Sequence, residues 1–391
     1  MFKLFFYGLI AKFLNLFIKT REKHWAFSAD YGKMYREGSK YLMEYMLKEH
    51  PDYQCTFFTM NKAVYEELKQ KGIPCKMNLS IAGIIAIAKC AVVFTTQSIS
   101  DIRYAFKKKN RRYYYMTHGM PYKHAWAMLP KGHIANLINN SKWKKRRNKI
   151  SASLTLGYKM KDVSFIPSCS EFLKGWQKKE FPGINIRVTG MARNDVLFDD
   201  KRMRQEQWID GTDGKFVIVY MPTHRGYGAG EVSPVPFLNR PDVQKWLEAN
   251  NVVLLVKNHP NMVRKMSTLV DKPCIKDISK AGLDPQVCIY HSDVLITDHS
   301  SVWMDFLLLR RPIIFYLYDD FEHEDVGTYY DIRQEHVGHV CEDEDGLFNL
   351  IQQVKVNYAA MSPEENVIRK FHQFVDGNSC ERMFNEVSKD Q

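Results

Sequence analysis

The sequence predicts an α/β protein of two doubly wound domains, each built on a parallel sheet with helices on both faces. The chain has 391 residues, more than one ordinary hydrophobic core accommodates. Apolar runs alternate with helical stretches along most of its length, as in parallel sheets covered on both sides. The polar stretch 199–215 separates two halves that share this alternation. We therefore expect a terminal segment at 1–23 and domains at 24–205 and 206–391, with a last helix able to pack back on the first domain.

The composition indicates an anionic partner. Hydrophobic residues make up 45% and aromatic residues 13% of the chain, which excludes a disordered protein. The formal net charge is +12, which is typical of proteins that bind nucleic acid, phospholipid head groups or phosphorylated substrates. The 8 cysteines are scattered without a CxxC pair, which favours buried thiols in a reducing compartment over disulfides or a zinc site.

The segment 1–23, MFKLFFYGLIAKFLNLFIKTREK, combines many apolar residues with a few lysines. Lys3, Lys12 and Lys19 interrupt the apolar residues, so no run reaches the ~20 residues that span a bilayer. No cleavage site of small residues follows, which disfavours a signal peptide. We expect an amphipathic helix in the membrane interface, with its lysines on anionic lipid. A first helix packed on the domain core is the alternative.

Apolar runs rich in β-branched and aromatic residues predict the strands of both halves. The run IAGIIAIAKCAVVFTT, which begins at Ile81 and is broken by Lys89, predicts a short helix followed by a buried strand. In the first half, strands are expected at 53–60, 90–96, 111–120, 163–169 and 184–190. In the second half, they are expected at 216–223, 252–260, 287–290, 293–297 and 312–318.

Chemically reactive side chains follow several of these strands. In open α/β sheets, ligands bind outside the carboxyl ends of the strands, so side chains at these ends are expected to share a site. A single histidine at a strand end is usually structural, whereas several strand ends with His, Arg or paired Ser indicate one site. These residues are His118, His224, Arg225, His259 and those of the turn 298–301.

Two adjacent serines follow the strand at 293–297. Ser300 and Ser301 are expected at the N-cap and first turn of the helix VWMDFLLL, where free N–H groups and the helix dipole attract an anion. Helix capping is the alternative, and it requires only one serine. Thr297 and Asp298 precede the pair and are assigned to the same donor-phosphate site. The chain has no GxGxxG loop and no Walker lysine motif, which disfavours NAD and ATP sites.

Histidines and cations supply the remaining chemistry. His118 stands before Gly119, where the backbone can turn sharply toward a ligand. A neutral imidazole is a suitable base for an alcohol proton, and a hydrogen-bonded structural histidine is the alternative. VKNHP sets Lys257 beside His259, two cations where negative charge can develop. Arg225, in MPTHRG, can hold phosphate through its forked guanidinium group.

Taken in order, the motifs resemble those of the CDP-glycerol glycerophosphotransferases, which include teichoic-acid primases and polymerases and related capsule enzymes. THGMPYK resembles the family's WHGTPLK, GMARND its GxPRND, YMPTHRG its APTWR, and VKNHP its RxHP. The longest match is SDVLITDHSSVWMDFLLLRRPIIFYLYD, and DGNSCER resembles the family's DGxxxER. The resemblance spans most of the chain. It implies a GT-B-like fold of two Rossmann-type domains that face a central cleft.

The chain departs from the family pattern at several motif positions. These changes retain the basic chemistry but leave the polyol and acceptor specificity open. Thr117 stands where the family has Trp, Ala192 where it has Pro, His224 where Trp is common, Lys257 where Arg is frequent, and His299 where it has Tyr.

The resemblance also implies roles for the candidate residues. By analogy, His118 is the general base that deprotonates the acceptor hydroxyl, which attacks the β-phosphorus of CDP-glycerol while CMP leaves. His259, with Arg225 and Lys257, would stabilise the charge on the pyrophosphate. The serine pair 300–301 would hold phosphate.

Other positions receive weaker assignments. Asp305 lies one helical turn beyond the serines and is expected to receive ribose hydroxyls. Five residues are expected at phosphate or the domain interface: Gly119, Arg193, Asn194, Asp195 and His224. The alternative for GMARND is a structural turn with Asn194 and Asp195 as caps.

No metal is predicted. The strand ends carry no DxD or HxxH ligand set, and the acidic run CEDEDG at 341–346 is typical of a solvated loop and helix start. No cofactor is expected, and the resemblance implies CDP-glycerol as the donor substrate.

Two basic runs remain, KKKNRR at 107–112 and SKWKKRRNK at 141–149. The second is expected to contact the membrane surface or an anionic acceptor chain rather than nucleic acid. A solvated basic loop is the alternative. The predicted patch consists of Lys144, Lys145, Arg146 and Arg147.

The resemblance and the residues together predict a peripheral enzyme on the cytoplasmic face of the cell membrane. It would transfer glycerol phosphate from CDP-glycerol to a cell-surface polymer or to its lipid-linked or glycan linker. The alternatives are a ribitol phosphate transferase that uses CDP-ribitol, a glycosyltransferase that uses a nucleotide sugar, and a non-enzymatic basic scaffold. The sequence leaves the acceptor, the oligomeric state and the choice between single addition and polymerisation open.

Overall fold

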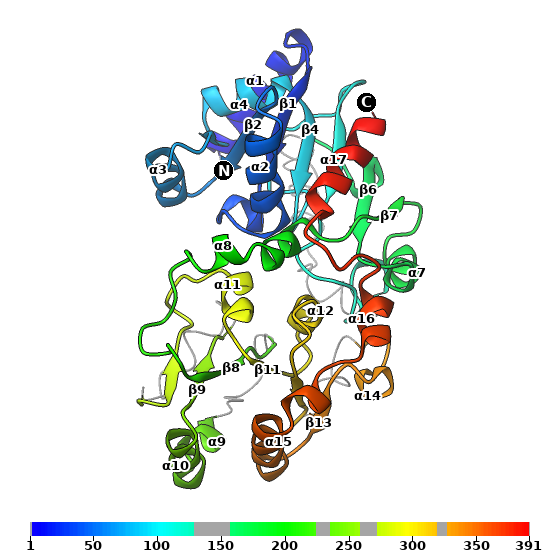
Figure 1. The fold of residues 1–391 in the computed structure, drawn as a ribbon. Coiled ribbons are helices and arrows are strands. Elements are labelled where there is room, and N and C mark those ends of the chain that lie inside the picture. Colours follow the sequence, from blue (N-terminus) through cyan, green and yellow to red (C-terminus); the bar gives the residue numbers. More distant parts are fainter. Residues whose placement is uncertain (1, 129–156, 224–234, 259–271, 319–326, 391) are drawn as a thin grey trace. The chain divides into compact units, whose positions relative to one another are not determined.

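The computed structural model describes residues 2–128, 157–223, 235–258, 272–318 and 327–390 (Figure 1). The chain forms two compact units. Unit 1 comprises residues 1–120, 125–195 and 376–391, and unit 2 comprises residues 121–124 and 196–375. The chain thus leaves unit 1 after Asp195 and returns to it at Asp376.

Unit 1 contains a sheet of 7 strands in the order β3-β2-β1-β4-β5-β6-β7, and all neighbouring strands are parallel. The first part of this order, with the reversal beside β1, is that of a Rossmann sheet. The strands are β1 (Arg21–Phe27), β2 (Gln54–Thr59), β3 (Cys75–Met77), β4 (Cys90–Thr95), β5 (Arg112–Tyr115), β6 (Val163–Ser168) and β7 (Ile186–Val188).

Helices cover both faces of the unit 1 sheet. Successive residues of β1 point to opposite faces, so Trp25 and Phe27 pack in one apolar cluster and Ala26 packs in another. The first cluster includes side chains of α2 and α17, and the second includes side chains of α1 and α4. Helix α17, drawn in red in Figure 1, therefore completes unit 1 from the other end of the sequence. The helices are α1 (Phe2–Phe17), α2 (Glu37–Glu49), α3 (Lys62–Gln70), α4 (Ile81–Lys89), α7 (Glu171–Glu180) and α17 (Ser379–Lys389), with short 3-10 turns η1 (Asp30–Gly32), η2 (Trp126–Met128) and η3 (Met160–Asp162).

Unit 2 contains a sheet of 6 parallel strands in the order β10-β9-β8-β11-β12-β13. Counted from β8, this is the Rossmann order again. The strands are β8 (Phe216–Tyr220), β9 (Val252–Val256), β10 (Ile275–Asp277), β11 (Val294–Thr297), β12 (Ile313–Tyr316) and β13 (His339–Cys341). The helices are α8 (Asp200–Met203), α9 (Val235–Asn239), α10 (Pro241–Ala249), α11 (Pro285–Tyr290), α12 (Val302–Leu307), α14 (Ile332–Glu335), α15 (Glu344–Val356) and α16 (Glu365–Phe371), with η5 (Tyr358–Met361); η4 (Ala192–Phe198) spans the change of unit.

In each sheet, the strand order reverses between two central strands. The reversal lies between β1 and β4 in unit 1, and between β8 and β11 in unit 2. Such a switch point is where an open α/β sheet binds its ligand, outside the carboxyl ends of the strands. A ligand site is therefore expected at each of these two switch points.

The α/β class and most expected strands are confirmed, and two expectations are corrected. Residues 287–290 are not a strand but part of helix α11, because Asp284 accepts a hydrogen bond from the N–H of Gln286 and Pro285 occupies the first turn. The central strand β1 was not expected; it begins at Arg21, inside the segment assigned to the membrane. The runs β3, β10 and β13 were also missed, since 3 residues are too few to show a period.

Candidate functional site

A buried carboxylate bridges the switch point of unit 1. Asp101 lies in the loop after β4, and its Oδ1 accepts a hydrogen bond from the N–H of Tyr31, in the loop after β1, at 2.9 Å. The same carboxylate accepts three more N–H groups from its own loop, those of Thr96, Gln97 and Ser98. Burial raises the pKa of Asp101 to about 6, although these N–H groups lower it. No motif marked this residue in the sequence.

The predicted base lies at the end of β5, on an unusual turn. Met116 still donates to the carbonyl of Thr95 in the neighbouring strand β4, at 2.8 Å. Thr117 then adopts a φ of +52°, a left-handed conformation that is rare for a β-branched residue. The side chain of Thr117 is buried, whereas His118 is exposed. The turn therefore presents the imidazole to solvent at the carboxyl edge of the sheet.

The sharp bend expected at Gly119 lies at Thr117 instead, because the positive φ in this turn belongs to the threonine. Buried residues on either side hold the bend in place. Met116 precedes it, and Met120 follows with its Sδ 3.7 Å from Sγ of Cys169. Backbone strain of this kind persists where surrounding packing enforces it, and it is frequent at functional sites.

A second buried aspartate bridges the switch point of unit 2. Asp298 directly follows β11, and its Oδ1 accepts the N–H of Thr223, in the loop after β8, at 2.7 Å. The hydroxyl of Thr297 donates to the carbonyl of Met221 in that same loop, also at 2.7 Å. Both side chains are fully buried. In this structure, Thr297 and Asp298 join the two loops, and their assignment to the donor-phosphate site stays a prediction.

The serine pair follows at the start of α12. Ser301 is the N-cap residue, but its side chain makes no capping hydrogen bond. Ser300 and Ser301 are both partly exposed, whereas His299 before them is buried. The capping alternative therefore does not account for the Ser301 hydroxyl.

Two predicted donor ligands have protein partners here. The Nζ of Lys257 donates to the carbonyl of Leu283 at 3.0 Å. The carboxylate of Asp305 is 4% exposed and lies 3.5 Å from the Nε2 of Gln286 in α11. Both contacts hold neighbouring segments of unit 2 together, so roles for Lys257 in charge stabilisation and for Asp305 at ribose stay predictions.

The end of the THGMPYK motif belongs to unit 2. Residues 121–124 form an antiparallel bridge between Lys123 and Thr328, and the N–H of His124 donates to the carbonyl of Gly327 at 3.0 Å. The Nζ of Lys123 donates to Oγ1 of Thr223 at 2.7 Å. Neither Lys123 nor Thr223 was predicted as a site residue, although Lys123 ends the THGMPYK motif and Thr223 lies in MPTHRG.

Tyr122 connects the same segment to the turn after β11. Its hydroxyl lies 3.4 Å from Nδ1 of His299, and its ring meets that of Trp303 edge-on, with centroids 6.0 Å apart. The hydroxyl of Tyr330 donates to the carbonyl of Pro121 at 3.0 Å. His299 is buried and contacts the Tyr122 ring, so it packs the loop that carries the serine pair against the segment 121–124.

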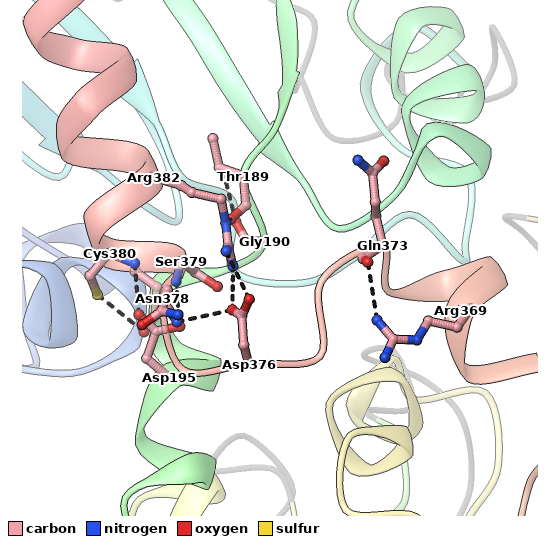
Figure 2. Close-up of polar contacts among 11 residues, drawn as sticks. Thr189, Gly190, Asp195, Arg369, Gln373, Asp376, Asn378, Ser379, Cys380 and Arg382 are labelled. Atoms are coloured by element: carbon pink, nitrogen blue, oxygen red, sulfur yellow. Dashed lines mark hydrogen bonds and ion pairs between the residues drawn. The ribbon is translucent and has the colours of Figure 1, made fainter. Parts of the chain in front are cut away.

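The GMARND motif holds the start of the last helix (Figure 2). Oδ1 of Asp195 accepts the N–H of Ser379 at 2.9 Å, and Oδ2 accepts that of Cys380 at 2.7 Å. Asp195 thus caps α17 from a distant part of the chain. The N-cap residue Asn378 makes no capping hydrogen bond with its own side chain. Burial raises the pKa of Asp195, although these N–H groups lower it.

An arginine of the DGNSCER motif completes this contact. Arg382 binds both carboxylate oxygens of Asp376, at 2.7 and 3.0 Å, and its Nε donates to the carbonyl of Thr189 at 2.9 Å (Figure 2). Gly190 has a φ of +79°, and a Cβ there would lie 2.3 Å from Oγ of Ser379, so only glycine fits. The two motifs therefore fasten both ends of unit 1 where the chain leaves and re-enters it.

Arg193 and Asn194 are buried within unit 1, at 4% and 3% exposure. The guanidinium of Arg193 lies 3.4 Å from the carboxylate of Glu37. These positions support the structural alternative for GMARND, and a phosphate contact of Arg193 stays a prediction.

The first basic run has a structural role. Arg111 is buried, and its guanidinium donates to the carbonyls of Ile87 and Ala88 at the end of α4. Lys108 donates to the carbonyl of Ala88 as well, and burial lowers its pKa to about 8. Lys108 and Arg111 therefore cap a helix, whereas Lys107 and Lys109 of the same run are exposed.

Several predicted residues lie outside the described part of the chain. They include the second predicted histidine, the cations of the MPTHRG motif and the second basic run. These residues are His224, Arg225, His259, Lys144, Lys145, Arg146 and Arg147.

Within the described residues, no group of three or more His, Cys, Asp and Glu side chains is arranged to hold a metal ion. The cysteines are unpaired thiols, and burial raises the pKa of Cys55, Cys90, Cys288 and Cys341 to about 12, so these thiols are protonated and inert at neutral pH. None of the helices in the described ranges is long and apolar enough to cross a membrane.

Comparison with known proteins identifies relatives along the whole chain. The model of the family described as CDP-Glycerol:Poly(glycerophosphate) glycerophosphotransferase matches residues 10–389. A teichoic acid glycerol-phosphate transferase of Staphylococcus aureus (strain NCTC 8325 / PS 47) is 26% identical over 380 residues, which cover 93% of this chain and 92% of that protein. A teichoic acid poly(glycerol phosphate) polymerase of Bacillus subtilis (strain 168) is 26% identical over 386 residues, 95% of this chain but 49% of that protein. The chain thus spans about half the length of the Bacillus relative.

A solved structure of the wall teichoic acid polymerase TagF, soaked with CDPG, is similar in fold. The TM-score is 0.70 at 21% identity, and the match covers 98% of this chain and 93% of that chain. At this identity, the likeness concerns the fold. It confirms the GT-B-like α/β class that the motifs implied.

Proposed function

Because this chain belongs to the CDP-glycerol:poly(glycerophosphate) glycerophosphotransferase family, we propose that it transfers glycerol phosphate from CDP-glycerol to a teichoic acid or a related cell-surface polymer. The observation that carries this proposal within the structure is the exposed imidazole of His118 at the carboxyl end of β5. An acceptor alcohol can reach this side chain, whereas the neighbouring side chains of Thr117 and Met120 are buried.

His118 is the proposed general base. A neutral imidazole is a suitable base for the proton of an alcohol. The rigid turn at Thr117 fixes where the ring is presented. Removal of the proton makes the acceptor oxygen a nucleophile, a step that typically contributes 10²–10⁴-fold to a rate.

The proposed step balances as a phosphoryl transfer. The acceptor oxygen forms a bond to the β-phosphorus of CDP-glycerol, and the bond from this phosphorus to the bridging oxygen breaks. The acceptor proton passes to His118, and the bridging oxygen leaves with CMP. Positioning and stabilisation of charge supply most of the catalysis in such reactions.

Unit 2 is the proposed donor-binding unit. Its switch point lies between the loop 221–223 and the turn 297–301, which Asp298 and Thr297 join. The partly exposed hydroxyls of Ser300 and Ser301 are suitable donors to phosphate oxygens. His259 and Arg225, which follow the ends of β9 and β8 in sequence, are proposed to neutralise the charge on the leaving phosphate.

The test is a donor screen with purified protein and a lipid-linked acceptor. We expect release of CMP from CDP-glycerol and a product heavier by one or more glycerol phosphate units in mass spectrometry. Preferential turnover of CDP-ribitol would assign ribitol phosphate instead. Release of a nucleotide from a nucleotide sugar alone would contradict the proposal.

The same assay tests the proposed absence of a metal requirement. Activity should persist in excess EDTA, because the proposed charges come from side chains. Loss of activity in EDTA, with recovery on addition of a divalent cation, would contradict this part of the proposal.

Helix α1 is proposed to attach the enzyme to the membrane surface. One face of the helix packs on unit 1 through Ala11, which is 2% exposed. The opposite face carries large apolar side chains in solvent, with Leu16 at 78% and Phe17 at 69% exposure. The exposed apolar residues of this helix are Phe5, Phe6, Leu9, Phe13, Leu16 and Phe17.

Cations accompany this apolar face. Lys12, Lys19 and Arg21 are exposed on α1 and just after it, where anionic head groups would lie next to an inserted helix. The helix packs on the core with one face and exposes apolar residues on the other, and this arrangement supports the proposed attachment.

Vesicle co-sedimentation tests this attachment. Phe13→Ser with Phe17→Ser should reduce binding to vesicles of anionic phospholipid. Val356→Ser is the matched control, since Val356 is an apolar residue on α15 with 80% exposure. Equal binding of all three proteins would contradict the role of α1.

The second basic run is proposed to assist at the membrane or at the anionic acceptor. Neutralisation of Lys144, Lys145, Arg146 and Arg147 should weaken binding to anionic vesicles or to a poly(glycerol phosphate) acceptor, and most strongly at low salt. Unchanged binding to both would contradict it.

A further inference from the structure

The ammonium group of Lys123 is held at the carboxyl ends of the central strands of unit 2. Its Nζ donates to Oγ1 of Thr223 at 2.7 Å, in the loop after β8. The N–H of Thr223 in turn donates to Oδ1 of Asp298 at 2.7 Å, directly after β11. A chain of hydrogen bonds thus connects Lys123 to the two strands between which the sheet order reverses.

The backbone around Lys123 is fixed to unit 2 on both sides. Lys123 itself forms a β-bridge with Thr328, and the N–H of Tyr329 donates to the carbonyl of Tyr122 at 2.9 Å. The next residue, His124, donates its N–H to Gly327 at 3.0 Å. Because the backbone is already ordered, only the lysine stem loses freedom when a ligand binds, which keeps the entropic cost of recognition low.

The chemistry of the group matches an anion. The Thr223 hydroxyl accepts a hydrogen bond from the ammonium group, and the side chain is half-buried, where charge interactions are less screened than in bulk water. Ligands of such sheets bind at the switch point, and lysine is a common phosphate ligand. We propose that Lys123 binds a phosphate group of the donor diphosphate, an inference that rests on the proposed function.

This assignment gives the THGMPYK motif two functions. His118 at its centre is the proposed base of unit 1, and Lys123 at its end would hold the donor in unit 2. Only four residues separate them in the sequence. The competing explanation is that Lys123 merely anchors residues 121–124 to unit 2.

Calorimetric titration of the full-length protein separates binding of charge from anchoring. The ligands are CDP-glycerol, CDP and cytidine, and the variants are Lys123→Met, Lys123→Arg and Thr223→Val. Lys123→Met should weaken CDP-glycerol and CDP about 10- to 100-fold, the range expected for a charge-assisted hydrogen bond, and leave cytidine within about 2-fold. Lys123→Arg should recover most of the loss.

Lys276→Met is the matched control. Lys276 is also half-buried in unit 2, but its Nζ donates to the carbonyl of Asp210 at 2.5 Å, beside the edge strand β10. This variant should bind all three ligands as the parent does, and each variant's melting temperature verifies that it folds.

Three results would overturn the inference. They are unchanged affinity of Lys123→Met for CDP, an equal loss for cytidine and CDP, and a loss in Thr223→Val as large as that in Lys123→Met. The last result would assign the effect to the hydrogen bond and not to the charge. If the parent binds UDP but not CDP-glycerol, the proposed function fails, and the same series with UDP and uridine still tests Lys123. Absence of any diphosphate binding would overturn both.

Discussion

The two units use the same arrangement to connect the loops at their switch points. In each, a buried aspartate after the fourth strand of the Rossmann order accepts an N–H from the loop after the first strand. Asp101 does so with Tyr31 in unit 1, and Asp298 does so with Thr223 in unit 2. Each carboxylate thus ties together the loops that border a switch point.

The units differ in what they present above this bridge. Unit 1 exposes a single imidazole, His118, on a strained turn at the end of β5. Unit 2 places partly exposed serines and Lys123 beside its bridge. The comparison shows that the same scaffold carries different exposed side chains in the two units, which we propose to be a proton acceptor in unit 1 and anion ligands in unit 2.

Removal of the imidazole should have the largest effect. His118→Ala is expected to reduce CMP release by about 10²–10⁴-fold, with little change in melting temperature, because the side chain is exposed. His336→Ala is a matched control, since His336 is also an exposed histidine but lies in unit 2, after helix α14. Full activity of His118→Ala would remove unit 1 from the chemistry.

The carboxylate of unit 1 should make stability depend on pH. Its folded pKa of about 6 lies above the ordinary value of about 3.9, so the folded protein binds the proton more tightly than the unfolded chain. The stabilising contribution is therefore complete below about pH 4 and is lost as the pH rises toward 6, by up to about 3 kcal/mol.

Denaturant unfolding between pH 4 and 7 measures this dependence. Asp101→Asn should be less steep than the parent over this window, because the titrating group is gone. An identical slope in both proteins would contradict the role of Asp101.

Removal of the Asp298 carboxylate, which bridges the loops of unit 2, should lower both the stability of the protein and its affinity for CDP-glycerol. Asp298→Ala leaves the buried N–H of Thr223 without its acceptor and should lower the free energy of unfolding by about 2 kcal/mol. It should also weaken CDP-glycerol binding, since the loops at the switch point separate. Asp293→Ala is the control, because Asp293 accepts the N–H of Val217 at 2.7 Å at the opposite ends of the same strands. A similar loss of affinity in both variants would show that stability alone governs binding.

The strained turn should give the smallest effect on stability, and in the opposite direction. Thr117→Gly relieves a left-handed β-branched residue and should raise the free energy of unfolding by about 1 kcal/mol. The turnover number should fall several-fold while the Michaelis constant for CDP-glycerol stays constant, because the imidazole is less well oriented. Thr117→Val keeps the branched side chain and should retain the turnover. A parallel loss of stability and turnover in the glycine variant would reject a positioning role.

Local patterns in the sequence predicted the scaffold well. The runs of β-branched and aromatic residues mark β2, β4 to β9, β11 and β12, because a buried parallel strand must be apolar on both faces. The central strand β1 escaped, since REKHWAF starts with exposed charged residues. The helix α11 was read as a strand because VCIY is too short for periodicity to distinguish the two.

The motifs identified which loops matter, but not what each side chain does in them. Thr297 and Asp298 were expected at phosphate, which stays a prediction, and the structure adds that they are buried and bridge two loops. Asp195 was expected as a local cap or an interface residue, and it caps a helix that begins at Ser379. Spacing along the chain cannot reveal partners so far apart.

The sequence by itself determined the family, the α/β class, and the position of His118 and the serine pair after strands, because these depend on residue types at short spacing. Only the tertiary structure decided that Asp101 and Asp298 are equivalent bridges, that the bend before the imidazole lies at Thr117, and that Lys123 belongs to the switch point of unit 2. The physical reason is that burial, backbone strain and hydrogen bonding between distant loops arise only when the parallel strands bring their carboxyl ends to one edge of a sheet.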